Sequence, residues 1–146
     1  MERAKLLIMR LNAGEAASAW PIIKVAIVNS GLCEEFSRDL GYYQQALISG
    51  EISCLLLTAP EKVYGVLLFS EYENHLTKKI DLLINAVANF RFVTDEEWHR
   101  VLEALKKIAA TDGCSSISFF TTNKRLQRLA RDERFIEKSF FTLELT

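Results

Sequence analysis

The chain has 146 residues, of which 49% are hydrophobic and 25% are charged, so we expect a single domain over residues 1–146 with a complete core. A net charge of −1 and a pI of about 6.1 exclude the overall basic field of a general nucleic-acid binder. The opening MERAKLLIMRL is basic and then apolar, but Arg10 and Asn12 interrupt it far short of the ~20 residues of a membrane span, so we expect a cytoplasmic protein without membrane association.

The first elements are a strand and two helices. Residues 5–11 read as a strand, and Asn12 with Glu15 three residues later is typical of a helix start. The apolar residues that follow indicate a helix, which Pro21 must kink or divide. A second helix is predicted over residues 33–48, ended by Gly50.

The middle of the chain changes to the period of strands. Residues 52–59, 62–73 and 78–90 are strand-like, and the short connections between them suit an antiparallel meander. In the third of these strands both faces are partly apolar, which predicts a central strand covered by helices on each side. Simple alternation would place Ile80, Leu82, Ile84, Ala86 and Ala88 on one face.

The last third returns to helices alternating with strands. A helix over 95–111 carries an apolar stripe and is terminated by Gly113. A strand over 115–122, a short helix over 123–131 and a closing strand over 136–145 follow. The order β α α β β β α β α β predicts an α/β fold of the α+β kind, with a mixed, mostly antiparallel sheet of about six strands and helices on both faces.

The cysteines give no sign of a metal or redox site. Cys33, Cys54 and Cys114 are widely spaced, lie beside apolar residues and form no CxxC pair. We interpret them as buried free thiols and expect no metal.

The start of the helix at 95 is the place where many α/β proteins seat a phosphate, because the first backbone N–H groups of a helix have no partner there. The stretch RFVTDEE has no glycine, and Asp95, Glu96 and Glu97 fill the first turn. Thr94 and Glu97 have the spacing of a capping box. The carboxylates already match the helix dipole, so the sequence predicts that an anion site here is closed.

The element order resembles the GCN5-related N-acetyltransferase (GNAT) family over the whole chain. In that family the fourth strand runs into a loop Arg/Gln-x-x-Gly-x-Gly/Ala that wraps the pyrophosphate of acetyl-CoA. Arg91 matches its first position, whereas Thr94 and Glu96 stand at the small positions. The resemblance implies cofactor-binding candidates at the end of the fourth strand, in the loop and before the last helix, namely Val87, Asn89, Arg91, Phe92, Val93, Thr94 and Asn123.

Further departures concern the end of the family pattern. The position of the tyrosine that protonates the leaving thiolate in many members is Ala130, and a glycine position is Arg134. The resemblance therefore implies a degenerate member, for which we expect no acetyl-CoA binding. Small GNAT-like proteins of this kind are similar to internal virion proteins of some tailed phages, so a virion is an alternative location.

Few residues are candidates for catalysis. Acetyl transfer to an amine needs a base, and Asp81 is the candidate, with Glu71 and Glu73 as alternatives. Carboxylates at strand ends are more often solvated charges. His75 and His99 are expected at the surface, without a Ser or Cys nearby in sequence that would suggest a nucleophile.

Residues 124–138 form a basic stripe, defined by Lys124, Arg125, Arg128, Arg131, Arg134 and Lys138. Such a stripe could meet nucleic acid, an acidic protein or the adenosine phosphate of CoA, or it could be an ordinary solvated face. Three functions stay open: a structural or interaction protein, possibly of a virion, that associates with protein partners or with itself; a divergent acyl-CoA-dependent N-acetyltransferase; and a nucleic-acid or protein-binding module. We rank the first highest and expect no nucleic-acid partner.

Overall fold

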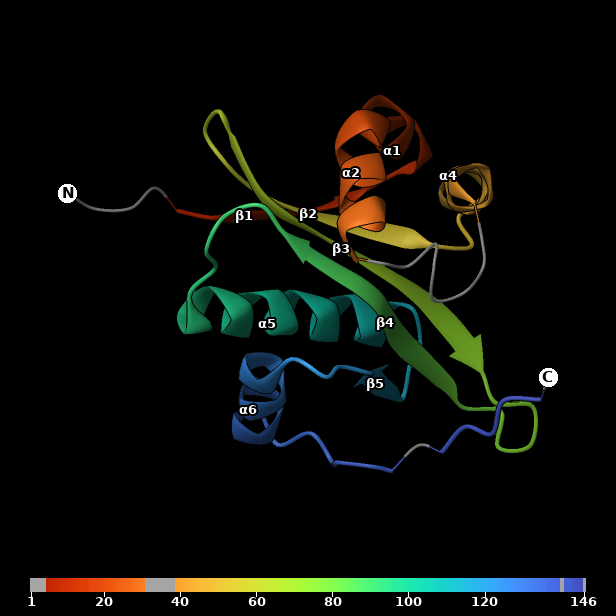
Figure 1. Cartoon of the computed structure of the whole chain (residues 1–146). Helices are drawn as coiled ribbons and strands as arrows, with labels where there is room; N and C mark the ends of the chain where they lie inside the picture. The colour runs from red at the N-terminus through yellow and green to blue at the C-terminus, as the bar shows by residue number, and fades with distance from the viewer. Residues whose placement is uncertain (1–4, 31–38, 140, 146) are drawn as a thin grey trace.

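A computed structural model describes residues 5–30, 39–139 and 141–145, and it places a five-stranded sheet at the centre of the molecule (Figure 1). The strands lie side by side in chain order: β1 (Leu7–Leu11), β2 (Ser53–Ala59), β3 (Lys62–Glu73), β4 (Ile80–Asn89) and β5 (Ser116–Phe119). The first four are antiparallel, and β5 runs parallel to β4. The predicted mixed, mostly antiparallel sheet is confirmed.

Helices cover both faces of the sheet, as predicted. On one face lie α1 (Ala13–Ser18), α2 (Trp20–Ser30) and α4 (Leu40–Ser49); on the other lie α5 (Asp95–Thr111) and α6 (Lys124–Asp132). Each face buries its own hydrophobic cluster, one around Ile27 and Leu68 and the other around Phe69 and Leu105. The sheet is therefore the middle layer of three.

The helix ends follow local chemistry. Asn12 and Glu15 form the expected capping box of α1, and this helix ends at its C-cap, Ala19. Pro21 then lies in the first turn of α2, where its missing N–H has no intrahelical acceptor to lose, so the predicted division is confirmed. The start of the predicted helix 33–48 lies outside the described residues; its described part begins at Leu40 and ends at Gly50, which adopts a φ of 82°.

A bulge in β4 changes which residues share a face. Leu68 lies opposite Ala86 while Phe69 lies opposite Ile84, so Asn85 is an extra residue in β4. One extra residue reverses the alternation. The prediction that Ile84 and Ala86 share a face is therefore wrong: Ile84 packs on the α5 side and Ala86 on the α2 side.

The predicted closing strand 136–145 is also wrong. Residues 136–139 and 141–145 form no strand, and β5 is limited to Ser116–Phe119 instead of 115–122. Alternation in a sequence shows that a segment could pair with an edge but does not supply the partner. The sheet therefore has five strands within the described residues instead of the expected six or so.

Two further features bear on sequence predictions. Cys54 is buried and burial raises its pKa to about 12, whereas Cys114 is only half-buried, and Cys33 lies outside the described residues. No helix among the described residues is both long and apolar enough to cross a membrane.

Candidate functional site

The segment between β4 and α5 is tied to the neighbouring strand. Tyr64 is an extra residue in β3, and its carbonyl accepts hydrogen bonds from the backbone N–H groups of Phe90 at 2.8 Å and Arg91 at 3.2 Å. The next residue, Gly65, lets the strands approach closely, because a Cβ there would lie 2.8 Å from the carbonyl oxygen of Ala88. Two amides that could face a phosphate are thus already bonded.

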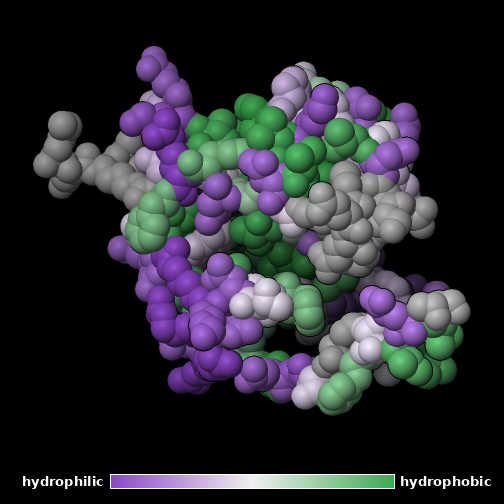
Figure 2. All heavy atoms as spheres, viewed as in Figure 1, coloured by the Kyte–Doolittle hydropathy of each residue, from purple (hydrophilic) through white to green (hydrophobic). Residues whose placement is uncertain are grey.

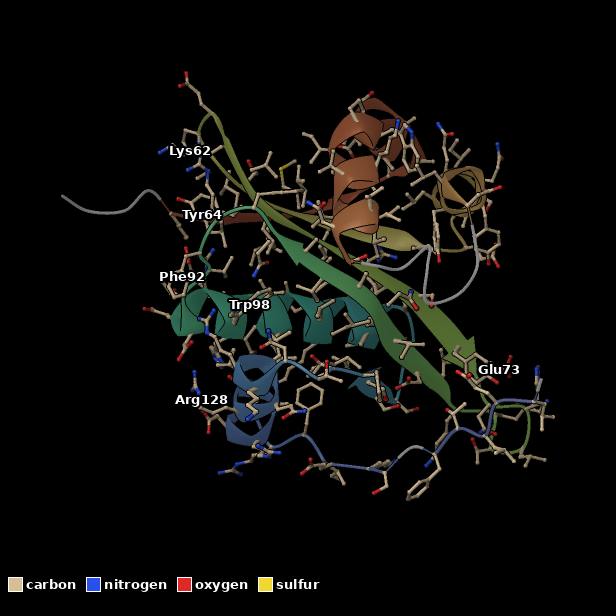
Figure 3. All side chains as sticks on the ribbon, viewed as in Figure 1. Lys62, Tyr64, Glu73, Phe92, Trp98 and Arg128 are labelled. Atoms are coloured by element: carbon tan, nitrogen blue, oxygen red, sulfur yellow. The ribbon has the colours of Figure 1, made fainter. Side chains whose placement is uncertain are left out.

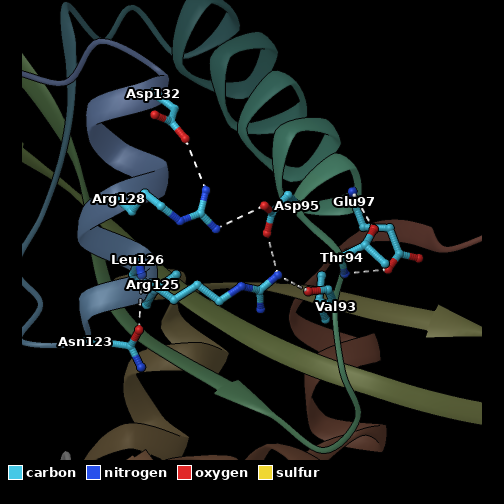
Figure 4. A network of polar contacts seen from close by, with 9 residues as sticks. All are labelled: Val93, Thr94, Asp95, Glu97, Asn123, Arg125, Leu126, Arg128 and Asp132. Atoms are coloured by element: carbon cyan, nitrogen blue, oxygen red, sulfur yellow. Dashed lines mark hydrogen bonds and ion pairs between the residues drawn. The ribbon is translucent and has the colours of Figure 1, made fainter.

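The capping box predicted at the start of α5 is confirmed (Figure 4). The backbone N–H of Glu97 donates to the Thr94 hydroxyl at 3.1 Å, and the backbone N–H of Thr94 donates to the Glu97 carboxylate at 2.9 Å. Glu97 is only 9% exposed, so this carboxylate is part of the packed helix start. Two more amides are satisfied within the chain.

Asp95 is bound by two arginines of α6 (Figure 4). One Asp95 oxygen lies 2.7 Å from Arg125 and the other 3.0 Å from Arg128, and both arginines lower the pKa of this carboxyl. Arg125 also donates to the Val93 carbonyl at 2.7 Å. We call Asp95, Arg125 and Arg128 the Asp95 clamp. Its carboxylate is an anion at a helix N-terminus, flanked by two cations.

The arginines of the basic stripe are largely neutralised by the chain itself. Besides the clamp, Arg128 pairs with Asp132 at 3.2 Å and Arg131 with Glu137 at 3.2 Å. The guanidinium of Arg125 lies 4.7 Å from the centre of the Phe92 ring. Figure 2 shows hydrophilic atoms gathered over α6 and the beginning of α5. Sequence alone did not pair Asp95 with these arginines, because they are 30 and 33 residues apart.

A cavity of about 90 Å³ lies between α5, α6 and the strands β4 and β5. Most of its wall is apolar and includes Val87, Trp98, Leu102, Phe119, Leu126 and Ala130. His99 of α5 and Glu133, just after α6, also line it and pair with each other. Neither the cavity nor the role of Trp98 in its wall was predicted.

The structure does not bring all of the predicted site residues together. Val93 is buried and Thr94 caps α5, whereas Asn89, Arg91 and Phe92 are exposed in or beside the loop. Asn123 caps α6 by accepting from the backbone N–H of Leu126 at 3.1 Å, so that it stands at the start of the other helix of the clamp.

Asp81, the candidate base, lies at the other end of β4, eight residues and therefore about 26 Å from Asn89 along the strand. Its carboxylate accepts hydrogen bonds from Ser116 at 2.7 Å and Ser118 at 2.8 Å. These bonds join β4 to β5 where the two strands pair. A base at this position is distant from the loop in which the family resemblance places most of the candidate cofactor-binding residues.

The other candidate bases, Glu71 and Glu73, lie at the end of β3, and His75 lies in the turn after it. A hydrogen bond with Asp112 raises the pKa of Glu71, and Glu71, Glu73 and His75 are all exposed. Glu73 can be located in Figure 3 at the end of β3. His99 is about half exposed, as expected for a surface residue. Within the described ranges, no three His, Cys, Asp or Glu side chains form a group that could hold a metal ion.

Comparison with known proteins identifies the architecture. No family model and no curated protein sequence matches the chain. Among solved structures it is similar to the aminoglycoside N-acetyltransferase AAC(6')-Iy in complex with CoA (TM-score 0.72, 13% identity, 99% of this chain and 97% of that chain covered). This chain has the GNAT fold.

Other structures with the GNAT fold agree over the same length. A predicted acetyltransferase with acetyl-CoA from Clostridium acetobutylicum matches with a TM-score of 0.68 and 12% identity, covering 97% of this chain and 96% of that chain. A ribosomal-protein-alanine N-acetyltransferase from Brucella melitensis matches with a TM-score of 0.67 and 10% identity, covering 97% and 99%. Identities this low establish a shared fold and leave the function to the site.

Proposed function

We propose that this chain is a GNAT-fold protein that has lost useful binding of acetyl-CoA and acts as a structural or interaction module. The observation that carries the proposal is the Asp95 clamp, in which the chain places its own carboxylate between Arg125 and Arg128 at the start of α5. A diphosphate approaching that helix start would be repelled by Asp95 and would compete with it for both arginines.

The amides of the loop support the same proposal. Phe90 and Arg91 donate to the Tyr64 carbonyl, and Thr94 and Glu97 are bonded within the capping box. A phosphate held by a loop depends on N–H groups that point at it without another acceptor. In this loop four such donors are already used by the chain.

The experiment is a thermal-shift titration with CoA and, separately, inorganic pyrophosphate. We expect no change in Tm for the wild type at millimolar ligand, whereas a ligand at ~100 times its Kd would stabilise the fold by about 2.7 kcal/mol. Asp95→Ala should release both arginines from this carboxylate and create a measurable shift with pyrophosphate. The matched control is Asp132→Ala, which also removes a partner of Arg128 but lies at the far end of α6 and should create none. A clear shift for the wild type with CoA would overturn the proposal.

The second candidate is a divergent acyl-CoA-dependent N-acyltransferase, which the solved acetyltransferase structures favour more directly than they favour the first. Its specific support is the separation of β4 and β5, which pair only along Asp81–Ile84 and Ser116–Phe119 within the described residues. Beyond Ile84, the bulge at Asn85 increases the twist of β4 and leaves its last residues without a strand partner on that side. Amide groups of a CoA arm could pair with such a strand edge.

An assay for release of free thiol from acetyl-CoA in the presence of amines would test this candidate. Activity that is lost in Asp81→Asn would assign Asp81 as the base and replace the first proposal. A nucleic-acid partner is the least supported of the three functions, because Arg125, Arg128 and Arg131 are paired with carboxylates.

The partner that we propose for the interaction module is a second copy of the chain. Four large apolar side chains of the C-terminal segment 136–145 are between 83% and 91% exposed, namely Ile136, Phe141, Leu143 and Leu145. Figure 2 shows hydrophobic atoms at the end of this segment. β5 is the last strand of the sheet, with an outer edge that no described strand covers. An open edge beside a strand-like segment is a template for pairing between chains.

The segment is held away from its own β5. Arg134 adopts a φ of 65°, and the ion pair between Arg131 and Glu137 anchors the following residues on α6. A groove of about 830 Å³ separates β5 from residues 134–138, and no backbone hydrogen bond joins them within the described chain. Because each copy carries one edge and one segment, a two-fold exchange would cover both in a closed dimer. Assembly in a phage virion is a more specific form of this proposal.

A further inference from the structure

Trp98 is a buried donor whose indole N–H makes no hydrogen bond within the described part of the chain. The side chain belongs to α5 and lies over α6 (Figure 3), and the residue is only 9% exposed. Buried indole N–H groups usually find a partner, because leaving a buried donor unsatisfied costs stability. An unsatisfied donor in a native fold calls for an explanation.

The position of Trp98 offers an explanation for the unsatisfied donor. The residue lines the cavity of about 90 Å³ between α5, α6 and the sheet. Leu102, Phe119, Leu126 and Ala130 make the surrounding wall apolar. An apolar cavity of about 150 Å³ holds a benzene molecule, so the smaller volume suits a ligand of about four or five heavy atoms. The only groups of the wall that carry charge or can titrate are Asp95, His99 and Glu133.

We propose that this cavity binds a small neutral molecule that is mostly apolar and carries one hydrogen-bond acceptor, such as a ketone, with Trp98 as the donor. The apolar wall excludes phosphates and free carboxylates, whose desolvation it could not repay. One carbonyl oxygen would satisfy the indole N–H, and the alkyl part would fill the apolar space. This proposal does not rest on the proposed function, because it requires neither CoA nor self-association.

The test compares butanone with 2-methyl-1-butene, which has nearly the same shape and lacks the acceptor. The chain has two tryptophans, so Trp20→Phe assigns the Trp98 indole proton in an NMR spectrum. We expect butanone to move that proton downfield in a saturable manner, and we expect the ratio of its affinity to that of the alkene to be higher in the wild type than in a variant without the N–H by on the order of fivefold, the effect of one neutral hydrogen bond.

Two variants locate the effect. Trp98→Phe keeps an aromatic ring without the N–H, and it should lose affinity for butanone while keeping its affinity for the alkene. Ala130→Leu should fill the cavity from α6 without touching the indole and abolish binding of both. A ratio of ketone to alkene affinity that is the same in the wild type and in Trp98→Phe would overturn the proposal. An indole proton that does not respond to butanone, or that shows contact with a bound water, would do the same.

Discussion

At the scale of single residues, Thr94 decides where α5 begins. Its hydroxyl accepts from the Glu97 backbone N–H, and loss of such a cap costs roughly 0.5–2 kcal/mol. We therefore expect Thr94→Ala to lower the free energy of unfolding by about 1 kcal/mol in urea denaturation. Thr122→Ala, at an exposed loop threonine, is the control and should have little effect. An unchanged midpoint for Thr94→Ala would mean that the cap does not stabilise the helix.

Arg134 adopts a backbone conformation that is unfavourable for residues other than glycine. It stands at the position that the family resemblance aligns with a glycine, and it adopts the left-handed conformation that glycine favours, with a φ of 65°. A side chain in that region costs about 1 kcal/mol. We expect Arg134→Gly to raise the free energy of unfolding by up to about that amount. Arg134→Ala removes the charge but keeps Cβ, so an equal gain there would attribute the effect to charge instead of conformation.

At the scale of elements, a pair of carboxyl groups joins β3 to the end of α5. A hydrogen bond with Asp112 raises the pKa of Glu71, and the same bond lowers the pKa of Asp112, which also pairs with Arg10 of β1 at 3.2 Å. Because the pKa of Glu71 is higher in the folded state, its protonated carboxyl stabilises the fold below the unfolded pKa. This contribution is lost as pH rises through the folded pKa. The lowered pKa of Asp112 contributes stability above the unfolded pKa of Asp112, and this contribution is lost as pH falls through the folded pKa.

Glu71→Gln tests this contact because the amide can still donate to Asp112 but never becomes charged. We expect the variant to melt at a higher temperature than the wild type at pH 7, and the difference to shrink as pH falls below the unfolded pKa of Glu71, because the carboxyl then becomes protonated in both states. The measurement is Tm against pH for both proteins. A difference in Tm that stays constant over this range would contradict a hydrogen bond in which protonated Glu71 donates to Asp112.

At the scale of the whole molecule, the open edge of β5 and the exposed C-terminal segment predict a dimer. We expect light scattering after gel filtration to give twice the chain mass of 16.6 kDa. Phe141→Glu with Leu143→Glu should shift the protein to monomer, because both side chains are exposed in the single chain and would be buried in the exchange. Leu76→Glu is the matched control, since Leu76 is 96% exposed in the turn between β3 and β4. A monomeric wild type would contradict the exchange.

The sequence by itself determined most elements and the capping box at the start of α5. Periodicity located α5 at residues 95–111, and Thr94 with Glu97 set its first turn, because capping depends on residues three positions apart. Local signals also divided α1 from α2 and terminated α4 at Gly50. Such features need only neighbouring residues, so they can be read without knowing the fold.

Tertiary structure alone decided what distant segments do to one another. The bulge at Asn85 depends on the pairing of β3 with β4, and it sent Ala86 to the face opposite the one that alternation predicted. Whether residues 136–145 form a strand depends on a partner edge, which pattern cannot provide. The Asp95 clamp and the Trp98 cavity exist only because α6 packs beside α5, and the 30 residues between Asp95 and Arg125 hide that contact from any local reading.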